Sequence, residues 1–254
     1  MSDRAIVEQL AGARPIALLP HARHRAAGVV GVLWRDGAAV AICAHRCELT
    51  ALPDAIGSLT RLERLDVGDN RLTELPALPA NLRELYIYDN QLARLPELPR
   101  LSVLDANRNQ LARLPALTDI DFVYLAANRL AAPPAISGVR YLNIGNNPLG
   151  HLEFADGAIQ ELRAEQAQLR TLAIERLTNL RELSLRSNQL ETLPPSIGSL
   201  ARLTALDLRD NQLDDLPETL RALPLKKLDL RWNPLRARPR WLDELAGRGC
   251  LVYT

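Results

Sequence analysis

Residues 62–95, LERLDVGDNRLTELPALPANLRELYIYDNQLARL, carry one pattern twice. Each copy has leucine at its first, fourth and eleventh positions, an aliphatic residue at its sixth and asparagine at its ninth. The two asparagines are Asn70 and Asn90. Apolar residues that alternate with polar ones before each asparagine are typical of a β-strand with one buried side. The pattern therefore predicts a short strand that ends in a turn at the asparagine.

The same frame recurs along most of the chain. It is centred also on Asn109, Asn128, Asn147, Asn188, Asn211 and Asn233, and in degenerate form on Cys47 and Ala167. About ten units cover roughly residues 39–238. One unit cannot bury its apolar side alone, whereas stacked neighbours enclose a continuous leucine core. A stacked repeat protein with parallel strands is therefore predicted.

The spacing L-x-x-L-x-L-x-x-N-x-L resembles that of the leucine-rich repeat family. The central units, LPALPANLRELYIYDNQLARLPELP, resemble the short repeats of secreted bacterial effectors of the YopM and IpaH type. The resemblance implies an α/β fold, a leucine-rich repeat solenoid curved like a horseshoe. A parallel sheet would line its concave side, with short extended, 3-10 or helical segments on its convex side and a cap at each end.

The ninth position of each unit predicts a structural turn. An asparagine amide there can bond backbone groups that would otherwise be buried without partners. In the family these side chains form a ladder, which the resemblance assigns here to Cys47, Asn70, Asn90, Asn109, Asn128, Asn147, Asn188, Asn211 and Asn233. Ala167 cannot form these bonds, so its unit is the predicted weak point of the stack.

Unit length predicts the shape of the segments that return between strands. The central units, 19 or 20 residues apart and rich in proline, leave room only for extended segments. The longer outer units are expected to form a helical turn over residues 54–59 and 196–200.

The two ends read as caps, which repeat proteins need to cover their terminal core. A helix is predicted from Ser2 or Asp3 to about Ala11, followed by a hairpin of residues 29–34 and 39–44. A helix over 241–246 and a strand over 250–253 are predicted at the other end. We therefore expect one continuous domain with caps at 1–38 and 239–254, complete at both ends.

Charge and composition limit the classes of protein to which this sequence can belong. The formal net charge is +1, which gives no general attraction to nucleic acid or to anionic membranes. The sequence shows no apolar run long enough for a membrane span and no secretory signal. Three cysteines are too few for a disulfide framework. We expect a cytoplasmic protein, with delivery into host cells by a signal-peptide-independent route as the alternative.

Residues six, four and two places before each ladder position are expected to face outward on the concave side. Five of the seven tyrosines and phenylalanines occupy such positions, and tyrosine is enriched at binding hot spots. The predicted partner-binding residues are Tyr86, Tyr88, Asp105, Phe122, Tyr124, Tyr141, Arg163, Arg186, Arg209 and Arg231. Two structural readings stay open: aromatic stacking that only stabilises the sheet, and arginines that only pair with Asp207 and Asp229.

No catalytic site, metal site or cofactor is predicted. Cys43 and His45 alternate with Cys47 along one strand, so their side chains should not converge on a metal. His21 and His24 lie in a basic connector that reads as a solvated loop.

The function that the sequence predicts is a protein-interaction module, not an enzyme, with a type III-like effector as one form of it. The alternatives are the substrate-recognition part of a ubiquitin-ligase system and a housekeeping bacterial scaffold. About 20 residues follow Asn233, too few for a ligase domain of the IpaH type. We expect a monomer with a protein partner and no nucleic acid, and a dimer through the concave side remains open.

Overall fold

The computed structural model describes residues 1–21, 27–155 and 157–254, so that His24 lies outside the described residues. The chain divides into two compact units, Met1–Asn128 and Arg129–Thr254. None of the helices in the described ranges is long and apolar enough to cross a membrane.

The first unit begins with a capped helix. Helix α1 (Asp3–Ala11) starts at Ser2, whose hydroxyl accepts a hydrogen bond from the first turn at 3.3 Å. It ends at Gly12, whose φ of 56° requires the freedom of glycine. The Asp3 carboxylate accepts a hydrogen bond from the Ala39 N–H at 3.0 Å, which ties the helix to the strands that follow. The predicted helix and both of its ends are confirmed.

A hairpin leads into the repeats. Strands β2 (Val30–Arg35) and β3 (Ala38–Cys43) pair antiparallel, and β1 (Ile16–Leu18) lies parallel to β2 at the edge of the sheet. The turn places Asp36 and Gly37 at φ of 49° and 77°, the left-handed pair that a two-residue hairpin needs. The predicted hairpin is therefore confirmed.

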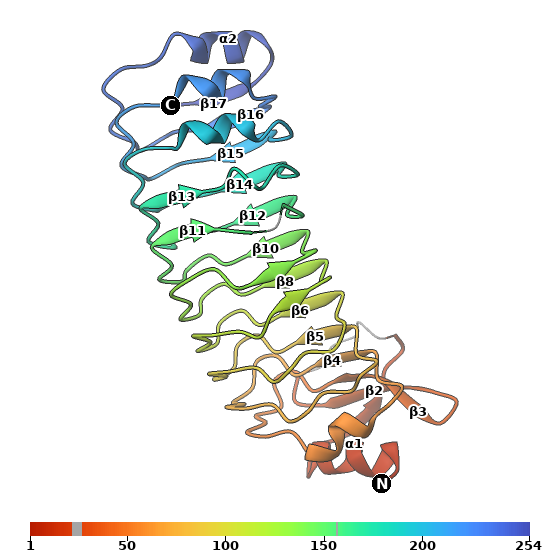
Figure 1. Ribbon diagram of the computed structural model, residues 1–254. Coiled ribbons are helices and arrows are strands. Elements are labelled where there is room, and N and C mark those ends of the chain that lie inside the picture. Colours follow the sequence, from red (N-terminus) through yellow and green to blue (C-terminus); the bar gives the residue numbers. More distant parts are fainter. Residues whose placement is uncertain (22–26, 156) are drawn as a thin grey trace. The chain divides into compact units, whose positions relative to one another are not determined.

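The repeats of the first unit add parallel strands to β3. These are β4 (Arg64–Asp66), β5 (Glu84–Tyr86), β6 (Val103–Asp105) and β8 (Phe122–Tyr124), which follow one another as arrows in Figure 1. The first return segment contains the 3-10 helix η1 (Asp54–Ser58), as predicted. The shorter return segments are extended, with the two-residue strand β7 (Leu117–Thr118) in one of them.

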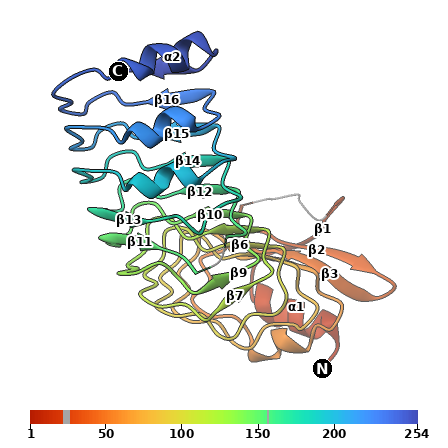
Figure 2. The same cartoon turned by 45° about the horizontal axis from the view of Figure 1, so that its top comes forward.

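The second unit repeats this architecture. Its parallel strands are β10 (Tyr141–Asn143), β12 (Glu161–Arg163), β14 (Glu182–Ser184), β15 (Ala205–Asp207), β16 (Lys227–Asp229) and β17 (Leu251–Tyr253). Its return segments hold β9 (Ile136–Ser137), the parallel pair β11 (His151–Glu153) and β13 (Thr171–Ala173), η2 (Pro195–Ser199) and η3 (Glu218–Ala222). Helix α2 (Trp241–Gly247) then lies beside η3 at the end of the unit (Figure 2). The helix and strand predicted near this end are confirmed, whereas η3 was not predicted.

The core of each unit is a stack of aliphatic side chains. The middle residue of every repeat strand is at most 2% exposed, as in Leu65, Leu85 and Leu104 of the first unit and Leu162 and Leu206 of the second. Burial of one such side chain contributes about 1.5–3 kcal/mol before the cost of ordering the chain. Each unit is therefore a solenoid of strand-and-return repeats, held by leucine.

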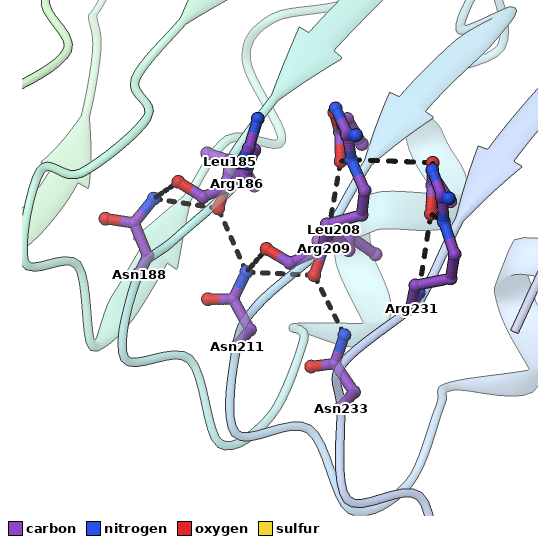
Figure 3. Close-up of polar contacts among 10 residues, drawn as sticks. Leu185, Arg186, Asn188, Leu208, Arg209, Asn211, Arg231 and Asn233 are labelled. Atoms are coloured by element: carbon purple, nitrogen blue, oxygen red, sulfur yellow. Dashed lines mark hydrogen bonds and ion pairs between the residues drawn. The ribbon is translucent and has the colours of Figure 1, made fainter.

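The asparagines form the expected ladder inside each unit. The Asn211 amide donates to the carbonyl oxygens of Leu185, Leu208 and Arg209 at 3.0–3.3 Å (Figure 3). Its oxygen accepts a hydrogen bond from the Leu190 N–H at 3.2 Å. One side chain thus bonds the backbone of its own repeat and of the preceding one. This is why asparagine, with two donors and an acceptor, occupies the position.

The two ladder positions without asparagine use their neighbours. The Cys47 thiol donates to the His45 carbonyl at 3.5 Å, and its backbone N–H donates to the Asn70 amide oxygen at 3.0 Å. Ala167 has no polar side chain, but its N–H likewise donates to Asn188, at 2.9 Å, and its carbonyl accepts from the Leu149 N–H at 3.1 Å. Because Ala167 has no side-chain amide, Asn188 accepts an additional hydrogen bond from the backbone at this position.

Candidate binding surfaces

Each sheet has an open face, which we define as the strand side chains that point away from the leucine core. In β5, Leu85 is fully buried while its neighbours Glu84 and Tyr86 are half-buried on the opposite side. This alternation places the predicted partner-binding residues of each unit on the open face.

The open face of the first unit is covered where it begins. Ala41 and Cys43, expected to face outward, are 1% and 2% exposed. Asp66, which lies four places before Asn70 and was therefore also expected to face outward, is fully buried. It accepts a hydrogen bond from the Gly68 N–H at 3.3 Å and lies 3.7 Å from the Arg64 guanidinium. The expectation of exposed groups was wrong here. At Asp66 the Arg64 guanidinium lies beside the carboxylate and is itself buried.

Cys43 and Cys47 are buried near this end of the unit. No cluster of three metal-ligating side chains that could hold an ion is found in the part of the chain that the structure describes. Burial raises the pKa of the Cys47 thiol, with the nearby Arg14 acting in the opposite direction. A raised pKa keeps the thiol protonated, whereas a nucleophile or metal ligand needs the thiolate.

Arg64 is the centre of a buried polar cluster that the sequence did not reveal. Its guanidinium pairs with Glu84 and lies 4.0 Å from the centroid of the Tyr86 ring. The Tyr86 hydroxyl donates to the same Glu84 carboxylate at 3.1 Å. Burial raises the pKa of Tyr86, against the lowering effect of Arg64, so this phenol remains a donor. These contacts with Arg64 and Glu84 hold Tyr86 to the sheet, while one side of it stays accessible.

Tyr88 also reaches back across a strand. A β-carbon added at Gly68 would lie 2.3 Å from its ring, so the ring rests directly on the glycine backbone. Its hydroxyl lies 3.1 Å from Nδ1 of His45. Glycine is required at position 68 for this approach.

Beyond Tyr88 the open face presents an acidic residue among aromatic ones. The strand register aligns Tyr86, Asp105 and Tyr124 in one row across β5, β6 and β8. In the adjacent row Phe122 is 42% exposed, an unusual position for a large apolar side chain on a sheet surface. A hollow of about 400 Å³ opens beside the first row and is lined by Tyr88, Asp89, Asp105, Asn107, Arg108, Ala126 and Ala127.

The remaining predicted aromatic residue and all four predicted arginines lie in the second unit. Tyr141 is half-buried on β10. Arg163 is exposed and donates to the Glu161 carboxylate at 2.8 Å, and this hydrogen bond raises the pKa of Arg163. Arg186 is exposed, and its side chain forms no ion pair with any residue that the structure describes.

The other two arginines belong to an alternating chain of charges. Arg209 donates to Asp207 at 2.9 Å and lies 3.4 Å from Asp229, to which Arg231 pairs at 2.7 Å (Figure 3). Burial by itself would raise the pKa of Asp229, but the hydrogen bonds from Arg231 and the charges of Arg231 and Arg209 hold it below its ordinary value. Arg209 and Arg231 are therefore paired with carboxylates, whereas Arg186 has no such partner among the residues that the structure describes.

The lowered pKa of Asp229 predicts a pH-dependent contribution to stability. A carboxylate whose pKa is lowered by folding stabilises the protein above its ordinary pKa, and this contribution is lost as the pH falls through the folded value. The Asp229→Asn variant should be less stable by about 2 kcal/mol at neutral pH, because it leaves two arginines without their shared partner. The deficit should shrink below about pH 4.

Urea unfolding at neutral and acidic pH measures this deficit. Asp210→Asn is the matched control, because Asp210 is exposed on the same unit and should show no deficit at either pH. A deficit for Asp229→Asn that is independent of pH would contradict the assignment.

Sequence reasoning missed the exposed residues at the far end of the second unit. Trp232 is 63% exposed, and Leu251 and Tyr253 of β17 are 59% and 40% exposed. The signal was available, since Trp232 occupies the place directly before a ladder asparagine, where none of the other repeats has an aromatic residue.

The repeats of this chain are similar to those of known proteins. The family model of the leucine rich repeat matches residues 168–235. YopM from Yersinia pestis, described as a leucine-rich effector protein, is 30% identical with a TM-score of 0.64, over 76% of this chain and 55% of that one. This chain is a leucine-rich repeat protein. Its repeats are of the bacterial, YopM-like type.

Further comparisons find the same repeat fold in other proteins. YopM from Yersinia enterocolitica is 28% identical with a TM-score of 0.59, over 78% of this chain and 52% of that one, so the chain spans about half the length of both YopM proteins. The Arabidopsis receptor kinase HAESA was solved in complex with the peptide hormone IDA and the co-receptor SERK1. It shares the fold at 20% identity and a TM-score of 0.59, over 80% of this chain and 40% of that one. No curated protein matches the sequence.

Proposed function

We propose that this leucine-rich repeat protein is a protein-interaction module that binds its partner on the open face of β5, β6 and β8. The observation that carries the proposal is the exposed Phe122 ring beside the Tyr86–Asp105–Tyr124 row. An exposed aromatic side chain beside a row of aromatic and polar side chains is typical of a binding hot spot, since the ring gains burial when a partner covers it.

The chemistry of the row favours a partner with a cationic group beside an apolar one. A guanidinium or ammonium placed at Asp105 would meet a carboxylate flanked by two phenol rings, which attract cations through their faces. The Phe122 ring would then cover the apolar part of the partner. Tyr86 and Tyr88, already held by Arg64 and Gly68, supply a rigid floor that loses little entropy on binding.

The decisive experiment compares binding by wild type and by a Phe122→Ala, Tyr124→Ala double variant. Affinity capture with mass spectrometry from bacterial and host-cell lysates identifies the partner, and calorimetry with the purified partner measures the affinity. We expect the double variant to lose at least about thirtyfold in affinity, as two hot-spot side chains would.

The control variant should keep the fold, and it changes a residue away from the open face. Arg113→Ala alters an exposed residue in the return segment after β6 and should leave the affinity unchanged. Equal capture by wild type and double variant would move the binding site elsewhere, and capture of no specific partner from either lysate would count against an interaction module.

A role as a secreted effector is the finer form of this proposal. It is supported by the likeness to YopM of Yersinia pestis, an effector protein. A reporter fused to the full chain and expressed in a bacterium with a type III secretion system tests it: arrival of the reporter in host cells supports an effector, and retention under conditions that export a known effector favours a scaffold inside the producing cell.

A further inference from the structure

We propose that the end of the second unit, at β16 and β17, is a separate docking surface for an extended acidic peptide. We define this terminal surface by Lys227, Arg231, Trp232, Leu251 and Tyr253. It lies on another unit than the site proposed above and shares no residue with it, so either proposal can fail alone.

Trp232 is the first observation. Its backbone is left-handed, with φ of 62°, and its side chain is 63% exposed. The equivalent places in the other repeats have the same conformation and carry Arg46, Asp69, Asp89, Arg108, Ala127, Asn146, Gln166, Ser187 and Asp210. A bulky residue is strained there, and Trp232 regains little of that cost by burial. A large indole held outward at such a position is suited to contact with another molecule.

The groups around Trp232 form one platform. The Arg231 guanidinium lies 5.4 Å from the centroid of the Trp232 ring and 5.2 Å from that of Tyr253, and its ion pair with Asp229 fixes it there. Leu251 is 59% exposed and lies opposite Lys227 in the register of β16 and β17. The surface therefore presents two aromatic rings and an aliphatic side chain between cations.

The edge of the sheet argues for a peptide. Strand β17 is the last strand of the sheet and pairs with β16 through its outer residues: the Leu251 N–H donates to Lys226 and the Tyr253 carbonyl accepts from Leu230. In a parallel ladder the intervening residue, Val252, directs its N–H and carbonyl to the other side. An extended peptide can bond to that edge, whereas a nucleic acid has no matching backbone.

The excess of basic side chains in this part of the chain favours an acidic peptide. Residues 221–254 hold eight basic and three acidic side chains. Lys226, Lys227 and Arg240 are exposed and form no ion pair with other described residues. Asp229, the carboxylate on this part of the open face, is 1% exposed and already occupied by arginines. Acidic side chains of a bound peptide would therefore meet cations and little opposing charge.

The test selects peptides on the purified full chain from a random library displayed on phage. Enriched sequences are synthesised with a fluorophore, and their affinity is measured by anisotropy. We expect enriched peptides to carry net negative charge and to bind at least about tenfold more weakly to Trp232→Asn and to Lys227→Glu. Asparagine tolerates the left-handed conformation, so Trp232→Asn should unfold at the same or a higher temperature than wild type.

The controls separate the alternatives. Asp210→Asn makes the equivalent change one repeat earlier, and Phe122→Ala alters the site proposed on the first unit; both should bind the peptides as wild type does. Enrichment without acidic bias, no enrichment, or equal binding to the two terminal-surface variants would overturn the proposal. Tighter binding of a fluorescent oligouridylate that is lost in Trp232→Asn would overturn it in favour of a nucleic-acid surface.

Discussion

The Asn188→Ala variant is expected to lose about 4 kcal/mol of stability, a large effect for a single side chain. The Asn188 amide oxygen accepts from the backbone N–H groups of Ala167 and Leu169 at 2.9 and 3.0 Å. Its nitrogen donates to the carbonyls of Ala164, Leu185 and Arg186 at 2.8–3.3 Å. The substitution leaves two fully buried N–H donors without an acceptor, and Ala167 has no side chain that could replace it.

Two further variants make this result specific. Asn233→Ala should cost about 1.5 kcal/mol, because Asn233 is partly exposed to water and its oxygen accepts a single bond, from Leu213. Ala167→Asn should stabilise the chain by about 1 kcal/mol by restoring the missing amide. Urea unfolding gives the free energies, and hydrogen exchange should show faster opening around residues 164–190 in Asn188→Ala. Equal losses for Asn188→Ala and Asn233→Ala would show that Ala167 places no extra demand on Asn188.

The Arg64→Met variant is expected to lose about 3 kcal/mol, the second large effect. The Arg64 side chain is 8% exposed and lies between two carboxylates, of which Asp66 is fully buried. Methionine fills most of the volume but removes the positive charge, so the buried Asp66 carboxylate and the partly exposed Glu84 carboxylate would be left without their shared counter-charge. Removal of one partner from a buried ion pair is costly for this reason, even where the pair itself adds little.

A double variant tests the electrostatic cause. Asp66→Asn in the Arg64→Met background should recover about 1 kcal/mol, since it removes one of the two stranded charges. Arg61→Met is the control, because Arg61 pairs with Asp36 on the exposed surface and its loss should cost less than about 0.5 kcal/mol. If Asp66→Asn adds its own cost instead of recovering part of the loss, packing of the arginine stem and not its charge holds the cluster.

The Arg64 cluster also limits how the aromatic surface can be probed. Tyr86 contacts Arg64 and Glu84, so Tyr86→Ala would disturb the fold and any binding together. Phe122, 42% exposed on the same face, can be removed at smaller cost. Binding experiments on the first unit therefore rest on Phe122 and Tyr124.

The sequence predicted correctly those features that depend on the regular spacing of residues. The leucine frame predicted the parallel strands, the ladder asparagines and the helical turns of the longer repeats, because strand alternation and repeat length depend on local spacing. Sequence reasoning was weak on the open face. It treated Asp66 and Cys43 as exposed, although both are buried, and it left undecided whether Tyr86 packs or binds.

The sequence by itself determined that this protein stacks leucine-rich repeats and that the unit around Ala167 lacks a ladder amide. Only the tertiary structure decided which outward-pointing side chains remain open, because a long side chain of one repeat, such as Tyr88, lies across a small residue of the repeat before it, such as Gly68. Those contacts join residues about 20 positions apart. Exposure therefore depends on pairs of side chains in different repeats, which a single-repeat pattern does not contain.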